Sequence, residues 1–261
     1  MTFHATNNFE GPIPQVIGKF KEFRGPNAFT RSIPSFIGNL QQLESLDLSS
    51  NNLRTSEPNP NEHPTSIISD TFPEGCWLQT LSLNQNRLEG KVPKSLGNCK
   101  CLEVLDIGNN QINDSFPCHL KNIAKLHVLV LRSNKFNGHI DCPRNNNGWP
   151  MLQIFDLASN NFSDAIPATI KGNKLELVKI PVNNFEGPIP EVIGKFEALD
   201  ALNFSHNAFT GSIPTTFGNL RELGSYSNNT GLCGPPLKTM CGLPPAKEDS
   251  PSDSETGSII H

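Results

Sequence analysis

The chain has 261 residues, a formal net charge of −4 and a sequence pI near 6.0. This near balance gives no electrostatic reason to expect a nucleic-acid partner, because such proteins carry a clear excess of lysine and arginine. No run of about 18 apolar residues occurs in the sequence, so we expect no membrane span within it. The seven cysteines are more typical of an oxidising compartment than of the cytosol.

One frame, L-x-x-L-x-L-x-x-N-x-L, recurs along the chain and usually continues into G-x-I/V-P. The asparagines Asn86, Asn110 and Asn134 stand 24 residues apart, as do Asn183 and Asn207. A period of this length is typical of a solenoid, in which each coil buries its apolar side against its neighbours. The clearest segments are LESLDLSSNNL (43–53), LQTLSLNQNRL (78–88), LEVLDIGNNQI (102–112), LHVLVLRSNKF (126–136), LQIFDLASNNF (152–162), LELVKIPVNNF (175–185) and LDALNFSHNAF (199–209).

Within each coil the x-L-x-L-x stretch alternates, which predicts a short strand with its leucines pointing inward. Stacked coils then pair these strands into a parallel sheet. The asparagine amide can satisfy backbone groups of its own and adjacent coils, glycine permits a tight turn, and I-P begins an extended segment. The sequence therefore predicts an α/β-type repeat. It is a leucine-rich-repeat solenoid with a parallel β-sheet on the concave face and irregular or 3-10 segments on the convex face.

Three stretches depart from the frame. Residues 7–20 match 183–196 at all but one position, but KEFRGP (21–26) stands where the later copy has EALDALNFSH (197–206), so we expect the early coil to lack its strand. A proline-rich insert interrupts the repeats, and Pro181 cannot donate to a sheet ladder. We divide the chain into degenerate near-duplicate repeats (1–42), a solenoid (43–223) with the insert at 54–77, a cysteine cap (224–242) and an acidic, disordered, juxtamembrane-like tail (243–261).

The residues between and just after the inward leucines are the best binding candidates, because they point to the concave face. Small polar side chains and scattered carboxylates there suit hydrogen bonding to a peptide or another protein. For any single residue, plain solvated surface is the competing interpretation. The predicted binding residues are Asp47, Ser49, Ser82, Asn84, Asp106, Arg132, Asp156, Lys179, Asn203 and Ser205.

Catalytic and metal-binding interpretations are weak. Ser205 and His206 could be combined with a strand aspartate, but they would line an open surface with no enclosed oxyanion site. Cys99 and Cys101 lead into a strand, whereas Cys118 follows a convex turn, so we do not expect them to converge on a zinc ion. We therefore expect no enzyme activity, no metal and no cofactor.

Two pairs of cysteines occupy equivalent positions in neighbouring coils. Cys118 and Cys142 are 24 residues apart, and Cys76 and Cys99 are 23 apart, so each pair forms either a disulfide or two buried thiols. Cys101 is left over. Sequons predict glycosylation in a secretory route, and a glycan at one of them would obstruct the concave face. The predicted glycosylation sites are Asn113, Asn161, Asn203 (the obstructing one) and Asn228.

The sequence resembles plant leucine-rich-repeat receptor-like proteins, especially those of the Verticillium-wilt-resistance type. The similar segments are 70–117, VLVLRSNKFNGHI (128–140) and NTGLCGPPLKTMC (229–241), so the resemblance covers nearly the whole chain. It implies the outer side of the plasma membrane, a microbial or peptide ligand, and a partner receptor-kinase ectodomain that docks on the final coils in defence signalling. It also implies that Cys233 and Cys241 form the disulfide that caps the last coil.

The sequence departs from this family at both ends. A signal peptide, an amino cap and many upstream repeats are not found, and the chain stops where the family's transmembrane helix would begin. We therefore expect a carboxyl-terminal fragment of such an ectodomain. The alternatives are a secreted leucine-rich-repeat inhibitor of microbial cell-wall hydrolases, built on the same solenoid, and a non-functional truncated product.

Overall fold

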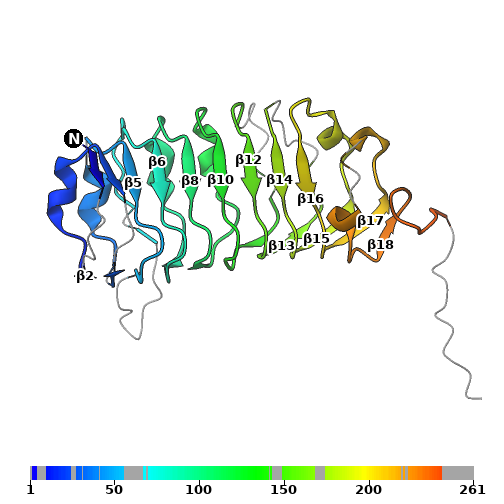
Figure 1. Ribbon diagram of the computed structural model, residues 1–261, viewed down its shortest axis with the longest axis horizontal. Coiled ribbons are helices and arrows are strands. Elements are labelled where there is room, and N and C mark those ends of the chain that lie inside the picture. Colours follow the sequence, from blue (N-terminus) through cyan, green and yellow to red (C-terminus); the bar gives the residue numbers. More distant parts are fainter. Residues whose placement is uncertain are drawn as a thin grey trace, which may run out of the picture.

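A computed structural model shows an elongated stack of coils that runs from the amino end to the cysteine cap at 224–242 (Figure 1). Strands and short 3-10 helices make up its regular structure, and the described residues include no α-helix. These features confirm the predicted solenoid. The structure describes residues 2–4, 10–24, 28–30, 32–40, 42–55, 67–68, 70–140, 142, 149–167, 174–218, 220 and 223–242.

Each coil contributes one strand to a nine-stranded parallel sheet that extends along the stack (Figure 1). Leu81 lies in register with Leu46 on one side and with Leu105 on the other. Equivalent positions of successive coils are therefore neighbours in space. In sheet order the strands are β1 (Thr2–His4), β3 (Glu22–Arg24), β5 (Ser45–Asp47), β6 (Thr80–Ser82), β8 (Val104–Asp106), β10 (Val128–Val130), β12 (Ile154–Asp156), β14 (Leu177–Lys179) and β16 (Ala201–Asn203).

Further strands follow the asparagine of each coil and form smaller parallel sheets. The largest of them has five strands and occupies the carboxyl-terminal half of the stack. Its strands are β11 (Asn137–Gly138), β13 (Asn161–Asp164), β15 (Asn184–Pro188), β17 (Ala208–Ser212) and β18 (Gly231–Cys233). Two pairs lie nearer the amino end, β2 (Glu10–Gly11) with β4 (Ala28–Phe29) and β7 (Glu89–Gly90) with β9 (Gln111–Ile112).

Short 3-10 helices lie on the side of the coil away from the nine-stranded sheet, and most of them follow an I/V-P turn. Proline stands at the N-cap of most of them, as Pro190 does, because its fixed φ suits the entry to a helix. They are η1 (Gln15–Lys19), η2 (Ser35–Asn39), η3 (Lys94–Asn98), η4 (Cys118–Asn122), η5 (Glu191–Lys195), η6 (Thr215–Phe217) and η7 (Leu223–Tyr226).

The core is a continuous apolar column inside the stack. In the amino-terminal half it is mainly leucine and isoleucine, whereas a stack of phenylalanines continues it toward the carboxyl end. Phe136, Phe162, Phe185 and Phe209 stack with successive centroid separations of 5.9, 6.0 and 6.1 Å. All four rings are fully buried. Such stacked pairs contribute about 0.5–1.5 kcal/mol each beyond the burial of their area.

The repeated asparagine joins each coil to the one before it. Asn110 donates from Nδ2 to the carbonyl oxygens of Leu83, Ile107 and Gly108 at 3.0–3.1 Å. Its Oδ1 accepts a hydrogen bond from the backbone N–H of Leu88 at 3.1 Å. One side chain thus satisfies backbone groups of two coils that water cannot easily reach, where an unpaired group costs about 1–3 kcal/mol.

The early coil keeps its strand, so the predicted loss of that strand is wrong. Strand β3 lies between β1 and β5, with Phe23 in register with Leu46. Phe23 is 2% exposed, and one large apolar side chain is therefore enough to place E-F-R in the sheet. Three residues are missing before this strand and one after it, relative to the later copy.

The proline-rich insert does not interrupt the nine-stranded sheet. β5 and β6 are direct neighbours, although the repeated asparagines that follow them (the ladder asparagines), Asn51 and Asn86, are 35 residues apart. Within the insert, residues 56–66 lie outside the described part of the chain, as does the predicted tail at 243–261. Pro181 follows the end of β14, and its carbonyl oxygen accepts a hydrogen bond from Ser159 N–H at 2.8 Å. The proline therefore takes no donor position in the ladder.

Candidate functional site

The outer face of the nine-stranded sheet presents three rows of side chains, because every second residue of each strand points away from the core. Two of these rows contain the predicted binding residues, and the strand register makes the members of each row neighbours. The third-position row consists of Asp47, Ser82, Asp106, Val130, Asp156, Lys179 and Asn203. The row two residues further along the chain consists of Ser49, Asn84, Gly108, Arg132, Ala158, Pro181 and Ser205.

Four members of the third-position row also form a turn at the end of their strands. The Oδ1 atoms of Asp47, Asp106, Asp156 and Asn203 each accept a hydrogen bond from the backbone N–H two residues later, at 3.0–3.1 Å. This local turn is a common use of aspartate and asparagine. The repeat frame marks these positions as solvent-facing and does not indicate this structural role.

In two of these turns, the other carboxylate oxygen of the aspartate, Oδ2, also has a partner. Asn84 donates from Nδ2 to Asp106 Oδ2 at 2.7 Å. Arg132 Nη1 lies 3.8 Å from Asp156 Oδ2, and Asp156 is only 5% exposed. Burial raises the pKa of the Asp156 carboxyl, against the opposing effects of the Ala158 N–H and the Arg132 guanidinium. The half-exposed Arg132 is therefore more available to a ligand than Asp156.

A further row, at the first position of each strand, was not among the predicted binding residues. Its members are Val104, Val128, Ile154, Leu177 and Ala201, which are in register on five adjacent strands. We call this set the apolar row. Its first four members are half-buried and Ala201 is exposed. The sequence marks this row as well, because its position directly precedes the second leucine of the frame.

Acidic residues border the apolar row where the chain enters the strands. Glu103, Glu176 and Asp200 each directly precede a member of that row, and we call them the acidic rim. Gln153 donates from Nε2 to Glu176 Oε1 at 3.0 Å. His127 and Gln153 hold the same position in the two coils between Glu103 and Glu176. The face therefore combines an apolar centre with a border that contains three carboxylates and one histidine.

The structure offers little for catalysis or metal binding. Ser205, a predicted binding residue, is only 5% exposed. His206 is exposed, and one of its ring nitrogens lies 2.6 Å from Asn228 Nδ2. Among the described residues, no three His, Cys, Asp or Glu side chains form a group that could hold a metal ion. The arrangement suits recognition by surface contact rather than chemistry in an enclosed site.

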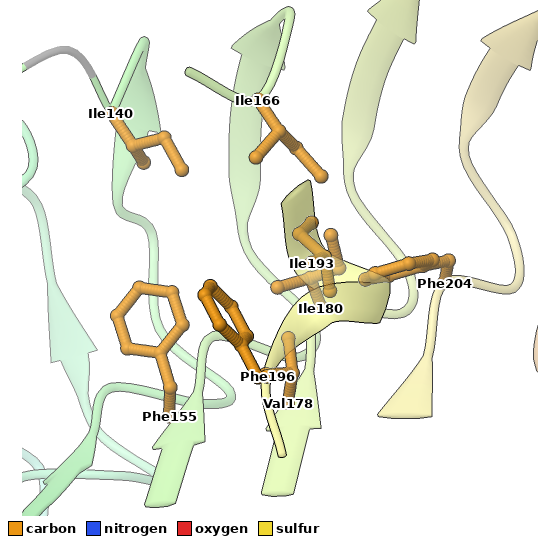
Figure 2. A pocket seen from close by; sticks show the side chains of 8 residues that line it. All are labelled: Ile140, Phe155, Ile166, Val178, Ile180, Ile193, Phe196 and Phe204. Atoms are coloured by element: carbon orange, nitrogen blue, oxygen red, sulfur yellow. The ribbon is translucent and has the colours of Figure 1, made fainter. Parts of the chain in front are cut away.

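The interior contains an apolar hollow (Figure 2). Its volume of about 10 Å³ is close to the least that one water molecule needs. Apolar side chains of several coils, with Ile193 of η5 among them, line it, and none carries a polar group (Figure 2). Its lining residues are Ile140, Phe155, Ile166, Val178, Ile180, Ile193, Phe196 and Phe204.

A polar hollow lies beside His119, on the side of the stack away from the nine-stranded sheet. Burial lowers the pKa of His119, against a hydrogen bond to the backbone of Pro93, and its buried Nε2 has no hydrogen-bond partner among the described residues. The neighbouring carboxylates serve the backbone, since Asp70 accepts from Ser95 N–H at 2.7 Å and Asp114 from Val92 N–H at 3.0 Å. We therefore assign this hollow a structural role.

Three disulfides bind neighbouring turns together. They join Cys76 to Cys99, Cys118 to Cys142 and Cys233 to Cys241. The coil spacing left the first two pairs open between disulfides and thiols, and the structure has them as disulfides. Cys101 is a free, half-buried thiol.

The four sequon asparagines differ in their surroundings. Asn113 and Asn161 are exposed, and each accepts a hydrogen bond from an asparagine of the next coil. Asn228 is exposed beside His206. Asn203 is half-buried on the sheet face, where its Oδ1 ends a strand. Glycosylation at all four sites stays a prediction.

Comparison with known sequences identifies the repeat. The family model "Leucine Rich repeats (2 copies)" matches residues 76–122, and "Leucine Rich Repeat" matches 42–63 and 198–220. The tomato (Solanum lycopersicum) "Receptor-like protein Cf-9 homolog" is 48% identical over 58% of this chain and 20% of its own length. The chain spans between 15% and 20% of the length of the curated relatives that it matches.

Solved structures with the same fold include two plant receptor ectodomains from Arabidopsis thaliana. One is the ectodomain of the receptor kinase GASSHO1/SCHENGEN3 in complex with CASPARIAN STRIP INTEGRITY FACTOR 2 (TM-score 0.75, 30% identity, 91% of this chain and 27% of that one). The other is the receptor kinase HAESA in complex with the peptide hormone IDA and the co-receptor SERK1 (TM-score 0.69, 26% identity, 91% and 42%). In the described part of this chain, no helix is long and apolar enough to cross a membrane.

Proposed function

Because this chain belongs to the plant leucine-rich-repeat receptor-like proteins, we propose that it forms part of a non-catalytic ectodomain that recognises a ligand on its concave face. The observation that carries the proposal is the register of the nine-stranded sheet, which brings equivalent outward side chains together over successive coils. The result is one long surface of half-exposed polar and apolar groups. A solenoid characteristically uses such a surface for binding.

The proposed ligand is a microbial or peptide ligand. In support, HAESA is seen with a peptide hormone on the same fold. An elongated sheet face also suits an extended polypeptide better than a compact small molecule, which needs a concave pocket. We place the intact receptor on the outer side of the plasma membrane, as expected for relatives that are named receptor-like proteins.

The proposed partner is a receptor-kinase ectodomain that docks on the final coils, about 175–223. The precedent is the HAESA complex, which contains the co-receptor SERK1. A receptor without a catalytic site of its own needs such a partner to pass on the signal. This arrangement assigns ligand contact to the sheet face and partner contact to the carboxyl-terminal end of the stack.

Ligand recognition is tested by immobilising the full chain and measuring surface plasmon resonance. The probes are fractions of fungal culture filtrate and synthetic IDA peptide. We expect one probe to bind and the double variant R132E/K179E to weaken it at least tenfold, because both cations lie on the sheet face. Lys195→Glu, an exposed charge reversal on η5, is the matched control. Equal loss in the control, or binding by no probe, would overturn the proposal.

Partner association is tested separately with purified SERK1 ectodomain and the probe that binds. We expect co-elution in size-exclusion chromatography, and its loss in E186K/E191K, which reverses two exposed carboxylates of the final coils. Glu89→Lys makes the same change on β7, outside these coils, and should leave the complex intact. Co-elution that survives E186K/E191K would place the partner elsewhere.

The hydrolase-inhibitor alternative predicts a different result. Under our proposal, microbial cell-wall hydrolases such as polygalacturonase keep full activity when mixed with excess protein. Inhibition that R132E/K179E abolishes would instead support the alternative. No observation of the structure favours it over recognition without inhibition.

A further inference from the structure

The apolar row is not required by the fold. In the coils nearer the amino end, the same strand position is held by Ser45 and Thr80, which are in register with each other and with Val104. The sheet therefore accepts hydroxyl side chains there without loss of its register. Five successive apolar side chains in the later coils thus call for a reason other than strand formation, although β-branched residues do favour strands in general.

The spacing of the row limits what can lie across it. Neighbouring strands are about 4.7–4.9 Å apart, so every second strand recurs at about 9.4–9.8 Å. A polyproline II segment rises about 3.1 Å per residue with three residues per turn, so every third side chain recurs at about 9.3 Å on one side. In a β-extended segment, alternate side chains recur at about 6.6–6.8 Å, which matches neither spacing. An extended segment with apolar side chains three residues apart therefore fits the row.

The charges beside the row limit the segment further. Around the apolar row, the rim carboxylates Glu103, Glu176 and Asp200 lie on one side, in the same row as His127 and Gln153. On the other side, Asp106 and Asp156 are accompanied by the cations Arg132 and Lys179. The acidic side is therefore the rim. In a polyproline II segment, the residues that directly follow the apolar ones all point to the same side of the segment. Basic residues at these positions would therefore face the acidic rim.

We propose that the apolar row with its acidic rim binds an extended peptide segment with the pattern apolar–basic–polar, repeated every three residues. This inference rests on the proposed function and specifies the ligand of the same face. Seven residues of this pattern place three apolar side chains over about 18.6 Å. Five strands span about 19 Å, so the three side chains reach Val104, Ile154 and Ala201.

The test uses the full chain and two fluorescein-labelled, end-capped peptides of identical composition, LKSLKSL and LKLKLSS. Fluorescence polarisation should show that LKSLKSL binds at least tenfold more tightly than its isomer. In the protein, I154T/L177T installs the hydroxyl type that the fold already accepts at Thr80 and should weaken LKSLKSL at least tenfold. Glu176→Gln should weaken it about twofold to fivefold, and this difference should shrink at high salt because rim charges are screened.

The control is Val16→Thr, the same apolar-to-hydroxyl change on η1, where Val16 is 45% exposed and away from the sheet face. Its binding should equal that of the native chain, and circular dichroism should show equal melting for all variants. Equal affinity for the two isomers, or no effect of I154T/L177T, overturns this inference. If neither peptide binds while a filtrate fraction or IDA still binds through Arg132 and Lys179, the inference fails and the proposed function stands.

Discussion

The two near-duplicate stretches differ in their described strands although their sequences are almost the same. In the later copy, β15 and β17 have five residues each and pair through Glu186 with Ala208, Gly187 with Phe209 and Pro188 with Thr210. In the early copy, β2 and β4 have two residues each, and Pro12 and Thr30, the counterparts of Pro188 and Thr210, lie outside them; residues 8, 9 and 31 are outside the described part of the chain. The residues of the frame thus specify that a strand pair forms here, whereas how far it extends toward its carboxyl end depends on what its neighbours provide.

The difference begins with the coil between each pair of strands. In the later copy this coil buries Leu199 and Phe204, which are 8% and 0% exposed. The early copy is four residues shorter there and uses Phe23 to hold the strand position. The later copy is also flanked by β13 and β18 on its two sides, so its strands are paired at both edges. Full strands therefore accompany a full coil and paired neighbours.

Exchanging the differing segments should give the largest effect. Replacing 197–206 by KEFRGP removes Leu199 and Phe204, and we expect a loss of about 5–10 kcal/mol, the sum of typical costs for deleting a buried leucine and a buried phenylalanine. That loss is comparable to the whole stability of many domains. Native-state hydrogen exchange should therefore show β16, β17 and β18 open while the middle coils stay protected.

The reciprocal exchange is the control for this prediction. Placing EALDALNFSH at 21–26 should slow hydrogen exchange of the Thr30 amide, which donates to the Gly11 carbonyl. Unchanged exchange in both chimeras would show that coil length does not set the strength of these strands.

Truncating the equivalent phenylalanines comes next in size. Phe209→Ala should cost about 3–5 kcal/mol, because Phe209 stacks on Phe185 and lies 5.8 Å from Phe204. Phe29→Ala, at the matching position of the early copy, should cost at least about 1 kcal/mol less, because the coil beside it is four residues shorter and buries Phe23 in place of Leu199 and Phe204. Urea unfolding measures both. Equal losses would contradict the asymmetry of the two copies.

The ladder asparagine of the later copy should give a smaller effect. Asn207 donates to the carbonyls of Ile180, Phe204 and Ser205 and accepts from Phe185 N–H. Asn207→Ala should therefore cost about 1–3 kcal/mol, measured by the same unfolding experiment. Asn184→Ala is the control, because its bond to Asn161 lies on the surface and should contribute under about 0.5 kcal/mol. A similar loss for both would mean that the ladder bonds have no special weight.

The sequence predicted the solenoid because each inward leucine and ladder asparagine recurs at a fixed period, so one correct coil implies the rest. It failed at Phe23, where the frame has no leucine and only the E-F-R alternation marks the strand. On the sheet face, the outward positions could be predicted, but not that Asp106 and Asp156 would be engaged by turns and neighbours. Those bonds join residues two apart in one coil or equivalent positions in adjacent coils, which a single frame does not specify.

The smallest expected effect concerns Val182, the residue directly before the later copy. Val182 has φ of +57° and is 49% exposed, in a row of turn residues where neighbouring coils place Ser159 and His206 at φ near +55°. A β-branched residue is strained in this left-handed region, whereas asparagine tolerates it. We therefore expect Val182→Asn to raise the free energy of unfolding by about 1 kcal/mol.

Ser159→Val is the matched reciprocal change, because Ser159 is exposed with φ of +56° in the preceding coil. It should lower the stability by a similar amount, about 1 kcal/mol, and thermal or urea unfolding of both variants decides the sign. If Val182→Asn stabilises the chain, the later copy holds its longer strands despite strain at its entry. If it destabilises the chain, Val182 contributes apolar contact that outweighs its backbone strain, and the advantage of the later copy begins one residue before its duplicated sequence.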